Sequence, residues 1–344
     1  MSDSTIVPAA ANDSFPASLI GVGNHSRRRL ITVLIQEFAA APFHLTQAAG
    51  LGIGADRLER ACAAGALTRV GRGWYAVANP VAPWLARLLV LQAENPGLVA
   101  CGATAALLGS MAVPPFRGVG AGELEVAFLE GSGGMRGRRH GLRARRWPIP
   151  PHHVVRGPHG VLMTDPLRTS IDLARGQSLP FALVPLDSAA RRAVADGMRP
   201  HEVVCELRAR LDLMRGRHGV RLAASALRHV SPLAESALES IVRGRIIEAG
   251  LPSPALQVPV VGESGRSYRA DLGLDLPGRP EGSFGLLIEA DGLGKYDRVE
   301  ALAEEKKRQH DLERRGHVFV RAIYGEALSR PEEFLSPIRR ILSR

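Results

Sequence analysis

The first hydrophobic pattern along the chain has the spacing of helices. Apolar residues three to four positions apart predict a helix over residues 26–40, at Leu30, Val33, Leu34 and Phe38. We expect Thr46 to cap a short helix that ends at Gly50, because a threonine before an apolar turn satisfies free backbone amides. A second helix is predicted over residues 56–64, closed by Gly65.

The pattern then changes to the alternation that is typical of strands. Two short strands are predicted, 67–70 and 74–77, around the turn Gly71-Arg72-Gly73. Helix, helix, turn, helix and hairpin is the order of a winged helix-turn-helix. We therefore assign that fold to residues 25–80, after a flexible tail of residues 1–24.

The hairpin carries a specific run of residues, Gly65-Ala66-Leu67-Thr68-Arg69-Val70-Gly71-Arg72-Gly73-Trp74-Tyr75. With the threonine-led helix and the helix after it, this run resembles the N-terminal domain of the AbiEi-type (type IV) antitoxins, whose signature is G-x-L-x-R-x-x-R-G-x-Y. The resemblance implies a recognition helix at residues 55–64 that reads DNA through Arg57 and Arg60, with Arg69 and Arg72 of the wing on the DNA backbone. The alternative is a protein-interaction module in which these side chains form a solvated face.

Residues 84–228 are interpreted as an α+β middle domain. Helices are predicted at 84–91, 103–108, 181–195, 200–213 and 219–228, and a strand at 124–129. Glycines interleave the arginines that follow this strand, which favours a hairpin with a basic tip that includes Arg138 and Arg139. That tip is either a second phosphate contact or a solvated loop.

A further motif in the middle domain places a helix start after a strand. Pro166 can occupy the first helical position, with Thr164 or Asp165 as the cap, and Arg168 and Asp172 are spaced as an i,i+4 pair. The residues Thr164, Pro166, Arg168, Thr169, Asp172, Leu173 and Ala174 resemble a T-x-P-x-R-T-x-x-D-L-A motif of the same antitoxin family. We interpret the Arg168–Asp172 pair as stabilising the helix.

The C-terminal residues 231–344 predict an αβββαβα order. A helix is expected from Ser231 to about residue 249, then strands at 257–261, 268–274 and 284–292, a helix at 299–315, a strand at 318–323 and a last helix at 331–341. This pattern places Glu235 on the first helix and Asp271 in the middle of a strand. Glu289 and Asp291 lie two apart on the next strand and so face the same side.

Clustered carboxylates suit a divalent cation. An acid deep in an apolar strand is costly unless it is paired or binds a metal, and carboxylate oxygens with open positions are what Mg²⁺ requires. Such an ion lowers the pKa of water and stabilises negative charge on a phosphate. We therefore expect Mg²⁺ as a cofactor.

The spacing of these residues resembles the PD-(D/E)XK nucleases, closest to a branch related to the very-short-patch-repair endonucleases. The matching motifs are Glu235, Asp271, the run Glu289-Ala290-Asp291-Gly292-Leu293-Gly294-Lys295-Tyr296, the run Glu305-Lys306-Lys307-Arg308, and Gly316, Phe319 and Arg321. The resemblance implies that Asp271 and Glu289 hold the metal and that Glu235 orients it. Asp291 stands where the standard motif has its lysine, so Lys295 or Lys306 would supply the positive charge.

Composition adds a polyanionic partner to this picture. The formal net charge is +10 and the pI about 10.4, with Arg supplying nearly all the excess, which indicates attraction to nucleic acid or an anionic surface. A GC-rich genome would explain the preference for Arg over Lys but not the net excess. The three cysteines, Cys62, Cys101 and Cys205, are far apart, which excludes a zinc-site spacing and favours reduced thiols in a cytoplasmic protein. No apolar run is long enough to span a membrane and the N-terminus lacks a signal-peptide pattern.

The sequence therefore predicts an α+β multidomain protein with an N-terminal winged helix-turn-helix, an α+β middle domain and a C-terminal αβα restriction-endonuclease-like domain. The leading hypothesis is a DNA-binding, Mg²⁺-dependent endonuclease that hydrolyses phosphodiester bonds. The alternatives are an antitoxin-like transcriptional regulator with a degenerate nuclease fold, and a protein that binds a partner such as a cognate toxin.

Overall fold

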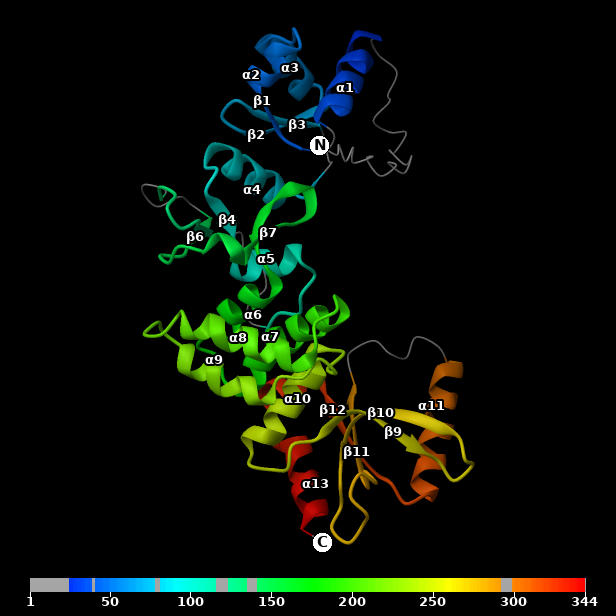
Figure 1. Cartoon of the computed structure of the whole chain (residues 1–344). Coiled ribbons are helices and arrows are strands. Elements are labelled where there is room, and N and C mark those ends of the chain that lie inside the picture. Colours follow the sequence, from blue (N-terminus) through cyan, green and yellow to red (C-terminus); the bar gives the residue numbers. More distant parts are fainter. Residues whose placement is uncertain are drawn as a thin grey trace, which may run out of the picture. The chain divides into compact units, whose positions relative to one another are not determined.

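The computed structural model describes residues 25–38, 41–77, 81–115, 123–134, 141–291 and 299–343 (Figure 1). The side chains of residues 25–28, 291 and 299–303 are outside this description. The chain divides into two compact units, Met1–Pro96 and Gly97–Arg344, which we call the N-terminal and C-terminal units. Each unit is described by itself.

The N-terminal unit contains the helices and hairpin predicted from the sequence. Its elements are α1 (His25–Phe38), β1 (Phe43–His44), α2 (Leu45–Gly50), α3 (Ala55–Ala63), β2 (Leu67–Gly71), β3 (Trp74–Val77) and α4 (Pro83–Glu94). The antiparallel strands have the order β1-β3-β2. The turn between β2 and β3 contains Gly73 at a φ of +75°, a conformation that glycine adopts without strain.

Two details of this unit differ from the prediction. The short strand β1 was not predicted, and its Phe43 lies opposite Tyr75 in the core of the unit. The prediction that Thr46 caps the following helix was wrong, because the extended His44 is the N-cap. Gln47 Oε1 accepts a hydrogen bond from His44 N at 2.7 Å, which completes a capping box that begins two residues earlier than expected.

The first half of the C-terminal unit is a five-stranded sheet covered by helices. Its order is β6-β5-β4-β8-β7. The elements are β4 (Leu98–Ala100), α5 (Gly102–Leu108), β5 (Leu124–Phe128), β6 (Leu142–Ala144), β7 (Val154–Arg156), β8 (Leu162–Thr164), α6 (Pro166–Ala174), α7 (Leu179–Ala195), α8 (Pro200–Asp212) and α9 (Val220–Ala226). The predicted hairpin after β5 was wrong, because β5 and β6 pair in parallel.

The predicted start of α6 is confirmed. Pro166 is at the first turn and Asp165 is the N-cap, with its Oδ1 accepting from Arg168 N at 2.8 Å. The predicted i,i+4 pair is also present, since Arg168 Nε lies 3.0 Å from Asp172 Oδ2. The side chain of Arg168 is buried, so this pair is part of the interior and not a surface feature.

The second half of the C-terminal unit has the predicted αβββαβ order followed by two helices. The elements are α10 (Ala237–Glu248), β9 (Ala255–Val261), β10 (Ser267–Leu274), β11 (Leu286–Asp291), α11 (Val299–Arg314), β12 (Val318–Ile323), α12 (Tyr324–Ser329) and α13 (Glu332–Leu342). Strands β9, β10 and β11 form an antiparallel meander, and β12 pairs in parallel with β11. Helix α11 connects these two parallel strands, as parallel pairing requires a crossover.

This sheet has apolar side chains on both faces. One face packs against α10, α12 and α13, in a core that includes Ile241, Leu272, Ile288, Ala327 and Phe334. The other face packs against α11 through Leu312, which contacts a cluster with Val258, Ala270 and Leu287. Figure 1 shows α13 and α11 on opposite sides of the strands.

The predicted start of the first helix was wrong. Helix α10 begins at Ala237, and Ser236 is its N-cap with Oγ accepting from Glu239 N at 3.1 Å. Ser231 and Pro232 precede the helix. Glu235 therefore lies just before the helix and not on it.

Helix α10 also packs against α7 through a buried ion pair. Arg243 Nη2 donates to Asp187 Oδ2 at 2.8 Å, and the same carboxylate accepts from Ser231 N and Ser240 Oγ, each at 2.8 Å. Gly244 faces Pro180 so closely that a Cβ there would lie 2.4 Å from Pro180 Cα. The region predicted as the middle domain and the C-terminal region thus share one compact unit, and the boundary predicted near residues 228–231 stays a prediction.

The α+β class is confirmed, whereas the three domain identities stay predictions. Among the helices in the described part of the chain, none is long and apolar enough to cross a membrane.

Candidate functional site

The register of β10 against β11 brings two predicted site residues together. Leu272 pairs with Ile288, so the next position along each strand places Asp271 beside Glu289. Here a side-chain oxygen, and not a backbone carbonyl, joins the two strands: Asp271 Oδ2 accepts a hydrogen bond from Ala290 N at 2.9 Å. Glu289 lies on the α11 side of the sheet, the side that Leu287 also faces.

Glu289 is a buried carboxylate held by a cation from α11. Glu289 is only 7% exposed, and Arg308 Nη2 lies 2.9 Å from its Oε1. Burial raises the pKa of the Glu289 carboxyl, Arg308 opposes that rise, and the charge of Asp271 adds to it. Arg308 also bonds Glu305, at 2.8 Å from Nη2, and this pairing together with Glu289 raises the guanidinium pKa.

Glu239 is a third carboxylate of this neighbourhood, and the sequence prediction did not include it as a site residue. It lies in the first turn of α10, where its Oε2 accepts from Glu235 N at 2.9 Å and from Gln257 Nε2 at 2.8 Å. Burial raises the pKa of the Glu239 carboxyl, hydrogen bonds oppose that rise, and the charge of Asp271 adds to it. The signal was present in the sequence, since Ser236-Ala237-Leu238-Glu239 has the spacing of a helix start.

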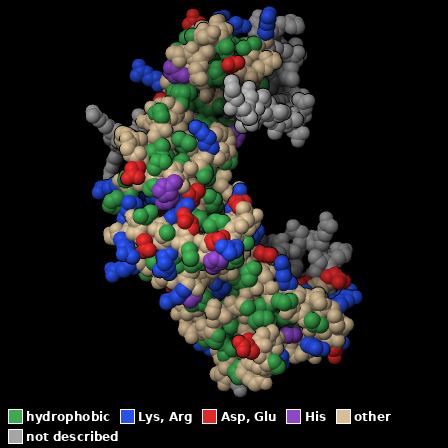
Figure 2. Space-filling view, in the orientation of Figure 1, with side chains coloured by type: hydrophobic (Ala, Val, Ile, Leu, Met, Phe, Trp, Pro, Cys, Tyr) green, Lys and Arg blue, Asp and Glu red, His purple; other side chains and the backbone are tan. Residues whose placement is uncertain are grey.

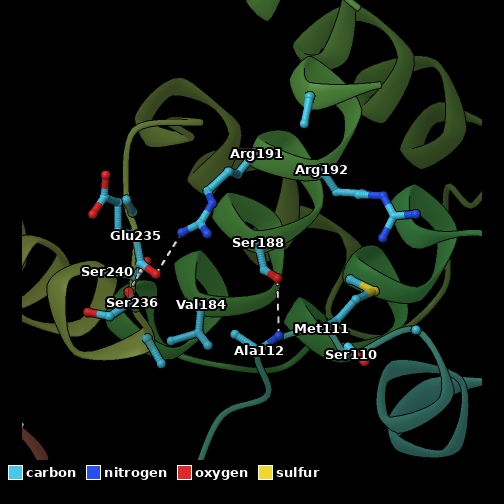
Figure 3. A pocket seen from close by; sticks show the side chains of 14 residues that line it. Ser110, Met111, Ala112, Val184, Ser188, Arg191, Arg192, Glu235, Ser236 and Ser240 are labelled. Carbon is cyan, nitrogen blue, oxygen red and sulfur yellow. Dashed lines mark hydrogen bonds between the residues drawn. The ribbon is translucent and has the colours of Figure 1, made fainter. Parts of the chain in front are cut away.

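Glu235 lies apart from the strand carboxylates. Its Oε2 is 3.0 Å from Arg269 Nη2, and both side chains are about half exposed. Glu235 lines a pocket of about 370 Å³ together with residues of α7, including Ser188 and Arg191. Figure 3 shows its carboxylate pointing away from Ser188, while its backbone oxygen accepts from Arg191 Nη1 at 2.7 Å.

The remaining predicted catalytic residues are only partly described. Asp291 ends β11 opposite Ile323, and its side chain is outside the description. Lys295 also lies outside the described residues. Lys306 is exposed on α11, and because it precedes Arg308 by two residues it projects from the opposite side of the helix. Arg308, and not Lys306, is the α11 cation that contacts the carboxylates.

The donor set fits a divalent cation held by two carboxylates. In the described part of the chain, no three His, Cys, Asp or Glu side chains are gathered closely enough to hold a metal ion. Mg²⁺ is commonly bound by one or two carboxylates, with water and substrate phosphate as its other ligands. Asp271 and Glu289 supply such a pair, and a cation there would stabilise the buried charge of Glu289.

The predicted DNA-contacting arginines of the N-terminal unit are exposed. Arg57 and Arg60 are on α3, whose buried face carries Leu58 and Ala61, and Arg60 Nε donates to Asp56 O at 3.1 Å. Arg72 is exposed in the turn between β2 and β3.

Arg69 of the wing has an acidic partner on α3. Its Nη1 lies 3.7 Å from Glu59 Oε1, an oxygen that also accepts from Tyr75 Oη at 2.8 Å. This arrangement ties the wing to α3. Arg138 and Arg139 of the predicted basic tip lie outside the described residues.

Comparison with known proteins finds distant relatives without a described activity. No protein-family model matches the chain. It is 28% identical over 281 residues to the uncharacterized protein Rv2248 of Mycobacterium tuberculosis strain H37Rv, covering 81% of this chain and 94% of that protein. The uncharacterized protein MT2308 of strain CDC 1551 matches with the same identity and coverage.

A solved structure is also distantly similar. The crystal structure of the Rv2827c protein from Mycobacterium tuberculosis matches at 16% identity with a TM-score of 0.38, over 67% of this chain and 83% of that one. These comparisons establish distant similarity to mycobacterial proteins.

Proposed function

We propose that the chain binds DNA and that its C-terminal region hydrolyses phosphodiester bonds with Mg²⁺ at Asp271 and Glu289. The observation that supports this proposal is the adjacency of these two acids on β10 and β11, at the position where Asp271 accepts from Ala290 N and Glu289 is buried. A carboxylate this deep in a sheet raises the free energy of the fold unless a positive charge balances it. A metal ion together with Arg308 would supply that charge.

Asp271 and Glu289 would hold the ion, and Glu239 would position them. Its carboxylate holds Gln257 of β9 and the backbone of Glu235, so it fixes the start of α10 against the sheet. A bound Mg²⁺ would make water more acidic and would place positive charge at the scissile phosphate. Glu239 takes the place of Glu235 of the family pattern in this proposal, because the charge of Asp271 acts on Glu239, whereas Glu235 pairs with the exposed Arg269.

Arg308 would act on the phosphate. Its guanidinium is anchored by Glu305 and Glu289, with Nη2 2.9 Å from the latter, so it lies beside the oxygen atoms that would face the reacting group. A planar guanidinium pairs with phosphate in two-point geometry. Arg308 would therefore neutralise charge on the substrate in the role that the standard motif gives to a lysine, with Lys295 and Lys306 as the other cations proposed from the sequence.

DNA would be positioned by the N-terminal unit. The exposed Arg57 and Arg60 lie on the face of α3 that is turned away from its buried Leu58 and Ala61. Arg72, in the turn between β2 and β3 of the wing, is also exposed. Such contacts depend on salt because they release counterions from the DNA.

The second candidate is an antitoxin-like transcriptional regulator in which the C-terminal fold is a scaffold. Its supporting observation is that two of the predicted acids already have arginine partners, Glu235 with Arg269 and Glu289 with Arg308. In that case the carboxylates are structural ion pairs, and DNA binding requires no metal. The two functions differ in what a divalent ion does.

A cleavage assay tests the proposal. Supercoiled plasmid is incubated with the full chain in Mg²⁺ or Mn²⁺, with EDTA as the metal-free arm. We expect nicking by wild type and its loss in Asp271→Asn, which keeps an acceptor for Ala290 N, and in Glu289→Gln. The matched control is Asp212→Asn, an exposed acid on α8 that pairs with Arg215, and it should cut like wild type. Equal cutting by wild type and Asp271→Asn would reject hydrolysis at this site.

A further inference from the structure

Three loops of the C-terminal unit bring arginines to an exposed tryptophan. Trp147 follows β6 and is 48% exposed. Arg217, between α8 and α9, places its guanidinium carbon 4.9 Å from the centre of the Trp147 ring. We call the set Arg143, Arg145, Arg146, Trp147, Arg175 and Arg217 the Trp147 surface. Neither the predicted nuclease site nor the winged-helix prediction uses it.

The loops are held together by close backbone contacts. Arg175, which follows α6, donates from Nε and Nη2 to His218 O at 2.9 and 2.7 Å. Gly219 has a φ of +76°, and a Cβ at this position would lie 2.4 Å from Gly176 N. The loop that carries Arg217 is therefore fixed against the loop that carries Arg175.

Positive charge exceeds negative charge here. Arg143 and Arg145 pair with Glu125, while Arg168 and Arg175 pair with Asp172, so these four arginines share two acids. Arg217 has no ion pair with a carboxylate in the described part of the chain. Burial lowers the pKa of Arg217, and so does the charge of Arg168, which is the effect expected of neighbouring cations. Figure 2 shows Lys and Arg side chains gathered over the part of this unit that contains α8 and α9.

We propose that the Trp147 surface binds an unpaired stretch of nucleic acid, with a base stacked on the indole and the flanking phosphates on Arg143, Arg146 and Arg217. The tryptophan selects this partner. An acidic peptide would use the arginines but has no need of an exposed indole, whereas bases stack on aromatic rings whatever their sequence. A duplex buries its base faces, so only unpaired nucleotides can use the ring. An arginine at cation–π distance from the same ring adds to this stacking platform.

The proposal extends DNA binding to a second surface and does not depend on phosphodiester hydrolysis. It is tested with the full chain in EDTA, by fluorescence anisotropy of labelled twenty-nucleotide oligothymidylate, oligouridylate and a mixed-sequence duplex. We expect wild type to bind at least one of the two single strands. Its relative affinity for oligothymidylate and oligouridylate will show whether the surface prefers DNA or RNA. Because cleavage requires a metal, failure of this experiment leaves the nuclease proposal intact.

The variants distinguish stacking from general electrostatics. Trp147→Leu should weaken single-strand binding about 5- to 150-fold, the range for one lost stacked base, while Trp147→Phe keeps most of the affinity. Arg217→Ala should weaken binding and reduce the salt slope by about 0.7. Arg340→Ala removes the same charge from an exposed position on α13 and should have no effect on the slope. Circular dichroism and the melting temperature verify folding, which the half-exposed Trp147 should not control.

Three results would overturn the proposal. The first is single-strand affinity of Trp147→Leu equal to that of wild type. The second is an equal loss of affinity for the single strand and the duplex in Trp147→Leu. The third is equal competition by polyglutamate for wild type and Trp147→Leu. The second and third would each show attraction of charge without recognition of a base.

Discussion

Arg308 Nη2 lies 2.9 Å from Glu289 Oε1, so a buried acid of the candidate site is held by a cation from the crossover helix α11. The same guanidinium nitrogen lies 2.8 Å from Glu305, which precedes it by one turn. This relationship is compatible with both proposed functions. In a nuclease the arginine is shared with the substrate, and in a regulator it is a structural ion pair.

Removing Arg308 separates these two roles. Arg308→Ala leaves the buried Glu289 without its cation, and we expect the free energy of unfolding to fall by about 1–3 kcal/mol, the usual effect of losing a hydrogen-bonded charge partner. If the site binds metal, millimolar Mg²⁺ will raise the melting temperature of Arg308→Ala more than that of wild type. Arg339→Ala, which breaks an exposed pair with Glu332, should change stability by less than about 1 kcal/mol. An increase in melting temperature with Mg²⁺ that is equal in Arg308→Ala and wild type would favour the regulator.

The pH dependence of stability should contain a contribution from His153. Burial, with Arg210 and Arg168, lowers its pKa from 6.5 to about 4. Between pH 6.5 and about 4 the unfolded chain binds more protons at this position than the folded chain. The contribution of the neutral His153 to the free energy of unfolding is therefore fully present above this window and is lost as the pH falls through it. His153→Gln still accepts from Arg168 but binds no proton. Urea unfolding at pH 7.5 and 4.5 should show a decrease that is smaller in the variant by on the order of 2 kcal/mol. Identical decreases would contradict this assignment.

The buried pair between α7 and α10 should be sensitive to the loss of one partner. Asp187→Ala leaves the guanidinium of Arg243, which is 4% exposed, without its carboxylate, and we expect a loss of about 3–5 kcal/mol. The double variant Asp187→Leu/Arg243→Leu removes both charges and should be less destabilised than Asp187→Ala. Denaturant melts of wild type, Asp187→Leu, Arg243→Leu and this double variant measure the coupling, and a coupling of zero would show that the pair is not a unit.

The wing should bind DNA more tightly when Glu59 is neutralised. Glu59→Gln removes the acid that lies 3.7 Å from Arg69 and leaves that arginine to the phosphates. We expect a few-fold gain in duplex affinity and a salt slope increased by up to about 0.9, the value for one added phosphate contact. Glu304→Gln, an exposed acid of α11 paired with Lys307, is the control. An unchanged slope in Glu59→Gln would place Arg69 away from the DNA.

Much of the fold follows from periodicity alone. Strands β10, β11 and β12 and the helix α11 were predicted to within about two residues, because apolar alternation in β10 and the apolar run of β11 leave little choice of register. The adjacency of Asp271 and Glu289 follows from that register. The sequence therefore predicted the two strands that carry Asp271 and Glu289, and the roles of these residues stay predictions.

The parts that were not predicted depend on competing local signals or on tertiary contacts. Ser231-Pro232 has the composition of a helix start, but Ser236 with Glu239 three residues later provides the cap that the chain uses, and this moves Glu235 off the helix. Strand β6 is at the edge of its sheet and pairs in parallel with β5, whereas glycines between two strands favour an antiparallel hairpin, so the local signal was misleading. The arginine partners of Glu235 and Glu289 come from distant segments, so no spacing rule reveals them.

Binding of Mn²⁺ to the full chain, followed by electron paramagnetic resonance of the free ion, tests most directly whether Asp271 and Glu289 hold a divalent cation. The account predicts saturable binding by wild type that is lost in Asp271→Asn and Glu289→Gln and kept in Asp212→Asn. Equal binding by wild type and Asp271→Asn, or no saturable binding by wild type, would contradict it.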